Sequence, residues 1–150
     1  MKNILLLIIF FFSYNLFASN YEVEFFFTVD DRDFDIMEFT DEITLRQFKS
    51  NANWKDNEGN YGVVECMGNH TIIKSERTLL KMYCKEINKS NDNFVIMFER
   101  DSENFDAGVG KSTYIDAVGK YKNYKNKKCI YAVNQFENKG SIIKQKCNLE

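Results

Sequence analysis

Residues 108–112 read Gly-Val-Gly-Lys-Ser, an order that ends the loop with which many enzymes bind nucleotide phosphates. In such a loop, backbone amides and the lysine surround the phosphate oxygens. The pattern also requires a glycine at position 105, where this chain has Phe105. We therefore predict no nucleotide and no other cofactor, and interpret Gly108 and Gly110 as a bend or bulge that enters a strand.

Four acidic side chains between residues 31 and 42 have the spacing of positions one, three, five and twelve of a calcium-binding loop. They are Asp31, Asp33, Asp35 and Glu42. The sixth position of such a loop needs glycine and is Ile36 here. The chain also has one histidine and no Cys-x-x-Cys pair, which argues against zinc. We therefore expect no metal, and interpret the segment as a solvated acidic connection between strands.

Acid–base or nucleophilic catalysis would have to involve His70 or a carboxylate held in an apolar interior. His70 would serve as a base only beside an activated serine or threonine, and we interpret it as structural or exposed. The carboxylates that could act as a general base are Glu65, Glu99 and Asp116. The sequence does not show which way they face, so we assign no catalytic residue.

Lysines and tyrosines alternate through residues 120–128, as in segments that bind phosphate backbones or stack on bases. The charge of the chain is uneven: residues 19–58 carry 4 basic and 11 acidic side chains, and residues 107–150 carry 9 basic and 3 acidic ones. We favour neutralisation within the fold, between the first and last strands. An anionic envelope surface is the alternative partner, and nucleic acid is not expected.

Phe, Tyr and Trp make up 15% of the chain and are typical of strand-rich structure. Some of them could line the mouth of a barrel and accept a small apolar or aromatic ligand. The predicted ligand-binding residues are Trp54, Tyr61, Tyr83, Phe98, Tyr114 and Tyr131. The alternative is that they only fill the interior, because small eight-stranded barrels are narrow enough for side chains to fill.

The elements that position these residues follow an N-terminal segment typical of an export signal. Lys2 precedes nine consecutive apolar residues, 4–12, whereas a helix needs roughly 20 to span a bilayer. Ala18 offers a small residue before a cut at Ser19. We expect residues 1–18 to be removed, and residues 19–150 to form one periplasmic or secreted domain that does not span a membrane. The glycosylation acceptors at Asn69 and Asn88 would matter only in a eukaryotic secretory pathway.

Four cysteines, Cys66, Cys84, Cys129 and Cys147, remain after such a cut and predict two disulfides. The first two and the last two are each 18 residues apart, with polar stretches at both midpoints that are typical of hairpin turns. Residues directly opposed in an antiparallel hairpin are close enough for a disulfide. We therefore predict the pairs 66–84 and 129–147.

Period-two alternation predicts about eight short strands in an all-β fold. Tyr21, Val23, Phe25 and Phe27 alternate with more polar residues, and Phe26 breaks that alternation. Residues 34–49 carry both a helical stripe and strand features, and we favour a strand at 43–49. The remaining strands are expected at 61–73, 79–87, 94–99, 113–117, 128–135 and 141–147, with a turn at 56–60. Sequential hairpins favour a closed antiparallel up-and-down barrel over a two-sheet sandwich.

Residues 48–148 resemble a group of small exported bacterial proteins of unassigned function. The resemblance is carried by residues 54–62, Cys66, residues 108–111, Tyr114, residues 119–121, Cys129 and residues 146–147. The glycine pair Gly108 and Gly110, with Gly119-Lys120-Tyr121, is also similar to glycine-bearing strands of calycin-like barrels, including the allene oxide cyclase and dirigent group. That second resemblance implies a barrel fold and supplies no catalytic residue for this chain.

These observations predict an exported, non-catalytic binding module that holds a small apolar or aromatic ligand. The first alternative is an envelope interaction protein that uses a basic C-terminal face. The second is an isomerase or cyclase on a calycin-like barrel, which would need one of the three carboxylates above to face an apolar interior.

Overall fold

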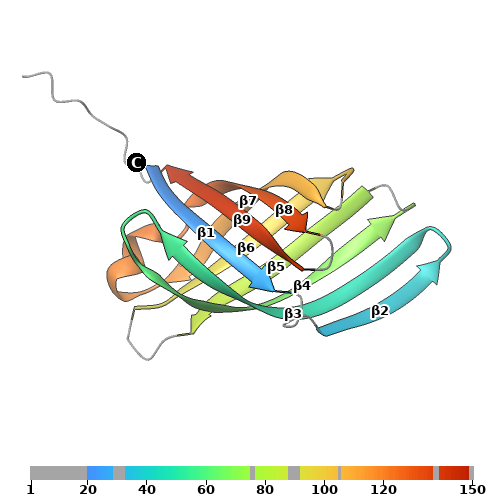
Figure 1. Cartoon of the computed structure of the whole chain (residues 1–150), viewed down its shortest axis with the longest axis horizontal. Helices are drawn as coiled ribbons and strands as arrows, with labels where there is room; N and C mark the ends of the chain where they lie inside the picture. Colours follow the sequence, from blue (N-terminus) through green and yellow to red (C-terminus); the bar gives the residue numbers. More distant parts are fainter. Residues whose placement is uncertain are drawn as a thin grey trace, which may run out of the picture.

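The structure, a computed structural model, describes residues 20–28, 33–74, 77–87, 92–104, 106–136 and 139–148. Residues 1–19, which hold the predicted export signal, lie outside these ranges, as do Asp31 and the acceptor Asn88. Nine antiparallel strands and one 3-10 helix occupy the described residues (Figure 1). They are β1 (Asn20–Thr28), β2 (Asp33–Thr40), β3 (Ile43–Asp56), β4 (Tyr61–Ile73), β5 (Arg77–Ile87), β6 (Phe94–Ser102), β7 (Ala107–Ala117), η3 (Gly119–Tyr124), β8 (Lys128–Phe136) and β9 (Gly140–Asn148).

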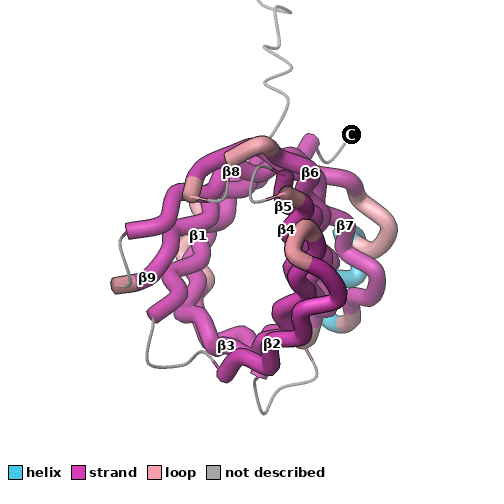
Figure 2. The backbone as a smooth tube through the Cα atoms, turned by 90° about the vertical axis from the view of Figure 1, so that its right-hand side faces the viewer, coloured by secondary structure: helices cyan, strands magenta, loops and turns pink. Residues whose placement is uncertain are grey.

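Eight of the strands, β1 and β3 to β9, close into a barrel (Figure 2). The first and last strands pair along their whole length, from Asn20 opposite Asn148 to Thr28 opposite Gly140. On its other edge β1 pairs with the second half of β3, from Val23 opposite Asp56 to Phe27 opposite Ala52. The predicted all-β barrel, closed by its first and last strands, is confirmed.

The strand β2 is additional to the barrel. It pairs with the first half of β3, so one edge of β3 is shared between β2 and β1. The ambiguous segment 34–49 is therefore two strands joined by a turn at residues 41–42, and the helical stripe does not form a helix. Pairing with the long strand β3 satisfies the backbone groups that a helix would otherwise have bonded internally.

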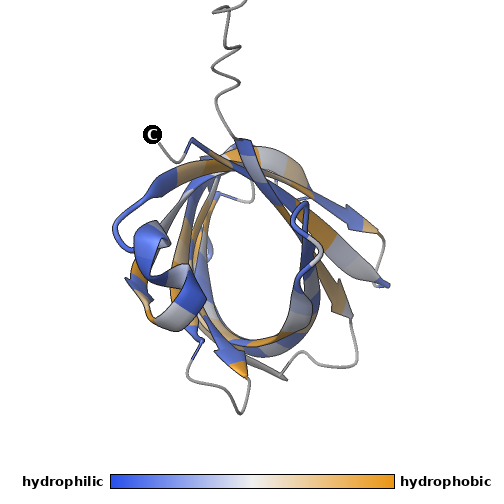
Figure 3. Cartoon of the chain, turned by 90° about the vertical axis from the view of Figure 1, so that its left-hand side faces the viewer, coloured by the Kyte–Doolittle hydropathy of each residue, from blue (hydrophilic) through white to orange (hydrophobic). Residues whose placement is uncertain are grey.

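The two ends of the barrel differ. At one end, here called the η3 end, β7 leads through η3 into β8, and η3 lies beside the barrel opening (Figure 3). At the other, here called the β2 end, lie the turn between β2 and β3 and the connections β4–β5, β6–β7 and β8–β9. The tyrosines of the lysine-rich segment, Tyr121 and Tyr124, are buried, while Lys120, Lys122 and Lys125 are exposed.

Alternation decides which side chains enter the barrel. In β1, Tyr21, Val23, Phe25 and Phe27 are buried, as the period-two pattern predicts. The residue that breaks the pattern, Phe26, faces outward, where the ammonium group of Lys55 lies 5.5 Å from the centre of its ring. A half-buried aromatic residue on the outer face therefore explains the interruption.

Both predicted disulfides are present. Cys66 is opposite Cys84 in the β4–β5 ladder, with Cα atoms 4.1 Å apart, and Cys129 is opposite Cys147 in the β8–β9 ladder at 4.4 Å. All four side chains are buried within the barrel. Each bridge therefore links two neighbouring strands from the inside.

Candidate functional site

The six predicted ligand-binding residues do not lie together. Trp54, Phe98, Tyr114 and Tyr131 are buried inside the barrel. Tyr61 and Tyr83 are 82% and 42% exposed on the outer face, so their side chains do not enter the barrel. The reason is strand parity: Tyr83 lies between the inward-facing Met82 and Cys84.

The inward-facing aromatic residues fill the η3 half of the barrel. Trp54 packs edge-on against Phe94 with ring centres 5.3 Å apart, and Phe94 packs against Tyr114 at 5.5 Å. Tyr121 of η3 contacts Phe94 in the same way at 5.2 Å. This half of the barrel is thus a close-packed aromatic core.

A chain of hydrogen bonds runs through that core. The hydroxyl of Ser112 donates to Oε1 of Gln145 at 3.1 Å, and Nε2 of Gln145 donates to the hydroxyl of Tyr114 at 3.2 Å. Tyr21 donates to Oδ2 of Asp56 at 3.0 Å. Burial raises the pKa of Tyr21 and Tyr114 far above the usual tyrosine range. Both therefore stay protonated, which suits hydrogen-bond donors in a core and not acid–base groups at neutral pH.

The β2 half of the barrel contains a cavity of about 60 Å³. This is room for about two water molecules at roughly 30 Å³ each. Its apolar walls are Phe27, Phe48, Leu80, Met82, Val133 and Ile143. Its polar lining residues are Ser50, His70, Arg100, Gln135 and Ser141. None of the six predicted ligand-binding residues lines it.

Basic side chains gather along one row of this inner face. The strand register places Arg46 opposite His70, His70 opposite Leu80, and Leu80 opposite Arg100, so the four form one continuous row across β3, β4, β5 and β6. His70 is only 8% exposed and Arg100 only 4%. The buried Nε atom of Arg46 has no hydrogen-bond partner among the described residues.

Arg100 is the residue that our sequence reasoning missed. Burial lowers the pKa of its guanidinium group, and the negative charge of Asp106 acts in the opposite direction. A signal was available, because Phe94, Ile96 and Phe98 face inward and the same parity brings Arg100 inside. An arginine that continues the buried face of a strand is unusual, since charged groups are rarely buried without a specific role.

The two glycines of the Gly-Val-Gly-Lys-Ser run make room for large inward-facing side chains. Both lie within β7, which therefore begins at Ala107 rather than near residue 113. A Cβ atom on Gly108 would lie 3.2 Å from Nη1 of Arg100, and one on Gly110 would lie 2.5 Å from Cζ of Tyr131. The register of the β6–β7 ladder shifts where Val95 and Ile96 face Asp116 and Tyr114, so the extra residue of this bulge is Ile115 of β7 and neither glycine.

The carboxylates considered as general bases do not face the interior. Glu65, Glu99 and Asp116 are all exposed on the outer face. Glu99 pairs with Lys81 at 3.3 Å, and Asp116 pairs with Lys125 at 2.8 Å. The arrangement that a cyclase-type reaction would need is therefore not formed by these three groups.

The residues that the structure describes contain no cluster of three or more histidine, cysteine or acidic side chains suited to a metal ion. Of the acidic segment, Asp35 and Glu42 are exposed. The side chains on this part of the chain thus give no reason to assign a metal.

Two wider depressions lie on the outside of the barrel, with volumes of about 490 and 510 Å³. Both are bordered by Val109 and Ile130, which are 64% and 63% exposed. About half of their lining residues are exposed, and inward-facing residues also border them: Leu80 and Arg100 in the first, Tyr131 and Gln145 in the second. The β2-end cavity is smaller, but all of its lining residues are buried or half-buried, and it is therefore the stronger candidate site.

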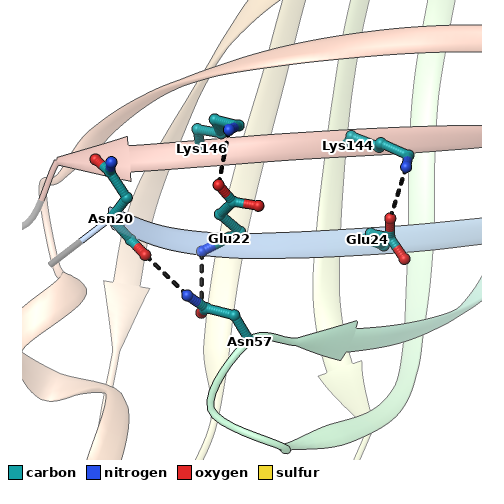
Figure 4. A network of polar contacts seen from close by, with 6 residues as sticks. All are labelled: Asn20, Glu22, Glu24, Asn57, Lys144 and Lys146. Carbon is teal, nitrogen blue, oxygen red and sulfur yellow. Dashed lines mark hydrogen bonds and ion pairs between the residues drawn. The ribbon is translucent and has the colours of Figure 1, made fainter.

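The basic C-terminal strand is neutralised within the fold (Figure 4). Lys144 pairs with Glu24 at 2.9 Å, and Lys146 pairs with Glu22 at 2.7 Å, both across the β1–β9 ladder. Beside them, Nδ2 of Asn57 donates to the carbonyl oxygen of Asn20, and its Oδ1 accepts from the backbone N–H of Glu22. The complementary charges of the first and last strands thus meet at the closure of the barrel.

Comparison with known proteins found no matching family model, no matching curated protein and no matching solved structure. No helix within the described part of the chain has the length and apolar character needed to cross a membrane. The assignment of a function therefore depends on the geometry of the barrel itself.

Proposed function

We propose that this chain is an exported, non-catalytic binding module that holds a small, largely apolar ligand in the cavity at the β2 end. The observation that carries this proposal is the difference between the two halves of one barrel. The η3 half is packed with aromatic side chains, whereas the β2 half keeps a cavity with apolar walls and buried polar groups. A few polar groups in an apolar pocket are the usual composition of a small-molecule site.

Export is part of the proposal. Two buried disulfides are expected in a protein that folds in an oxidising compartment such as the periplasm or the cell exterior. The charge and length of residues 1–18 agree with removal of a signal peptide. A ligand taken up outside the cytoplasm suits a binding module of this kind.

The alternative, an envelope interaction protein with a basic face, has less support. Lys144 and Lys146 are paired with glutamates of β1, and Lys125 is paired with Asp116. Ion pairs of this kind reduce the net positive field that an anionic surface would attract. We therefore place ligand binding first.

A matched pair of substitutions tests the proposal. Val133 lines the cavity, and Val109 lies on the outer face. Val133→Phe is expected to fill the cavity and abolish binding of the slender neutral probe 1-octanol in isothermal titration calorimetry, while Val109→Phe is expected to leave binding unchanged. Circular dichroism and thermal unfolding would confirm that both variants are folded. Failure of the unmodified protein to bind the probe, or equal binding by both variants, would count against the cavity as a ligand site.

A further inference from the structure

We infer that the ligand of the β2-end cavity carries a carboxylate and that Arg100 binds this group. The inference rests on the proposed function, because it names the chemical class of ligand for the same cavity. It adds two claims, that Arg100 contacts the ligand and that the ligand is negatively charged. Experiments can reject both claims even if the cavity binds a neutral apolar ligand.

The location of Arg100 carries the argument. Its side chain is 4% exposed, lies inside the barrel and lines the cavity. Removing a guanidinium group from water is costly, and apolar residues of similar size commonly replace buried charges without loss of stability. The residue opposite it in the same row, Leu80, is apolar, so Arg100 and His70 are the basic members of the row that line the cavity. The guanidinium group is therefore placed on the cavity wall, where it can contact an anionic group of a ligand.

The surroundings of Arg100 are organised around its position. Gly108 leaves space for the guanidinium group, since a Cβ atom would lie 3.2 Å from Nη1. The acidic residues on either side of Arg100 in the chain, Glu99 and Asp101, face outward and pair with Lys81 and Arg77. Asp106 acts on the guanidinium charge from the β6–β7 connection. The strand thus directs its two carboxylates away from the interior and its arginine toward it.

The basic character of the row extends beyond Arg100. His70 also lines the cavity, and Arg46 is its direct neighbour on β3. The buried Nε atom of Arg46, which has no hydrogen-bond partner among the described residues, adds a donor on the same inner face. Two arginines and a histidine in one cross-strand row favour a negatively charged guest over a neutral one.

The size and geometry of the cavity favour a carboxylate. A volume of about 60 Å³ suits a small head group, and the cavity is partly open to solvent, so the rest of the ligand can extend outside it. The planar guanidinium group can bind both oxygens of a carboxylate at once. A carboxylate carries one negative charge, whereas a phosphate ester carries ~1.5 to 2, which a single guanidinium group balances less well. We therefore expect a monocarboxylate with an apolar body.

The test compares two probes of equal length on the disulfide-bonded protein by isothermal titration calorimetry. Octanoate carries the carboxylate, and 1-octanol carries a neutral hydroxyl on the same chain. The unmodified protein is expected to bind octanoate roughly tenfold or more tightly than octanol, because hydrogen bonds to a charged group are stronger than neutral ones. Equal affinities for the two probes would overturn the carboxylate inference, and this comparison needs no variant.

Two variants identify the anchor. Arg100→Met is expected to weaken octanoate binding roughly tenfold or more while leaving octanol binding unchanged. Arg77→Met, the same change on the outer face, is the matched control and should bind octanoate normally. Arg100→Lys keeps the charge without the planar fork and should fall between the unmodified protein and Arg100→Met. Unaltered octanoate binding by Arg100→Met would exclude Arg100 as the anchor. Failure of the unmodified protein to bind either octanol or octanoate would instead reject the ligand-binding function as a whole.

Discussion

Gly108 of β7 lies against Arg100 of β6 inside the barrel, so closely that a Cβ atom on the glycine would be 3.2 Å from Nη1 and 3.3 Å from Cδ of the arginine. The absence of a side chain at Gly108 thus leaves clearance for the buried arginine. Its neighbour in the motif, Gly110, has the same relation to Tyr131. The run that resembles part of a phosphate-binding loop is explained by side-chain clearance within a strand.

The two glycines should respond differently to alanine. At Gly110 the new methyl group would meet the carbonyl oxygen of Glu99 at 2.5 Å, which is backbone and cannot move aside without disturbing the β6–β7 ladder. At Gly108 the nearest atoms belong to the side chains of Ser102 and Arg100. Gly110→Ala should therefore lower the free energy of unfolding by about 1–3 kcal/mol or more, and Gly108→Ala by less, in urea denaturation. A larger loss for Gly108→Ala would contradict this account.

Alanine substitutions of inward-facing and outward-facing aromatic residues should differ strongly in their effect on the free energy of unfolding. Trp54 is 2% exposed and packs on Phe94 and Tyr121, so Trp54→Ala should cost about 3–5 kcal/mol of stability. Tyr61 is 82% exposed, and Tyr61→Ala should change stability by less than about 0.5 kcal/mol. Chemical denaturation followed by circular dichroism measures both. Similar losses for the two variants would contradict the strand register that places Trp54 inside the barrel and Tyr61 outside it.

The closure of the barrel should depend on pH through Glu24. Its carboxylate accepts from Lys144 of β9 at 2.9 Å and from Lys55 of β3 at 3.1 Å, and the hydrogen bond from Lys144 is the main reason that its pKa is lowered. A lowered folded-state pKa stabilises the fold above the unfolded value near 4.5, and this contribution is lost as the pH falls through the folded value. Because the lysines are exposed, Glu24→Gln should lower the free energy of unfolding by only about 1 kcal/mol at neutral pH.

The Glu24→Gln deficit should shrink as the pH falls from the unfolded pKa near 4.5 through the lower folded pKa, because the unfolded carboxylate is protonated first and the folded one only below that lower value. The exposed glutamate Glu65 of β4 supplies the matched control, Glu65→Gln. Urea unfolding of both variants across acidic and neutral pH checks the expectation. A deficit that stays constant with pH would show that the two ion pairs contribute nothing to closure.

The disulfides should contribute separately to stability. Each closes a loop of 18 residues, for which the chain-entropy model gives about 3 kcal/mol. Replacing Cys66 and Cys84 by alanine, or Cys129 and Cys147, should therefore lower the free energy of unfolding by about that amount. The bridges lie in different hairpins, so the two losses should add when all four residues are changed. Non-additive losses in urea denaturation would indicate that the two hairpins are coupled.

Local features of the sequence predict most of the strands. Tyr61–Ile73 was expected as a strand over the same residues, and both disulfide pairs followed from the equal spacing of the cysteines and the hairpin geometry. These features need only period-two alternation and contacts within one hairpin. The sequence predicts β7 only over residues 113–117, whereas the strand begins at Ala107. Glycines usually interrupt strands, and the clearance that Gly108 and Gly110 provide for Arg100 and Tyr131 depends on neighbouring strands, which the local sequence does not show.

By itself, the sequence determined the strand class, the disulfide pairs and the charge complementarity of the first and last strands. Only the tertiary structure decided that β1 and β2 share one edge of β3, and that Tyr61 and Tyr83 face outward. The physical reason is that the alternation of side chains along a strand assigns residues to two faces, but does not say which face becomes the interior of the barrel. That choice is made when β1 bonds to both β9 and β3 and the sheet closes, which depends on contacts between residues far apart in the chain.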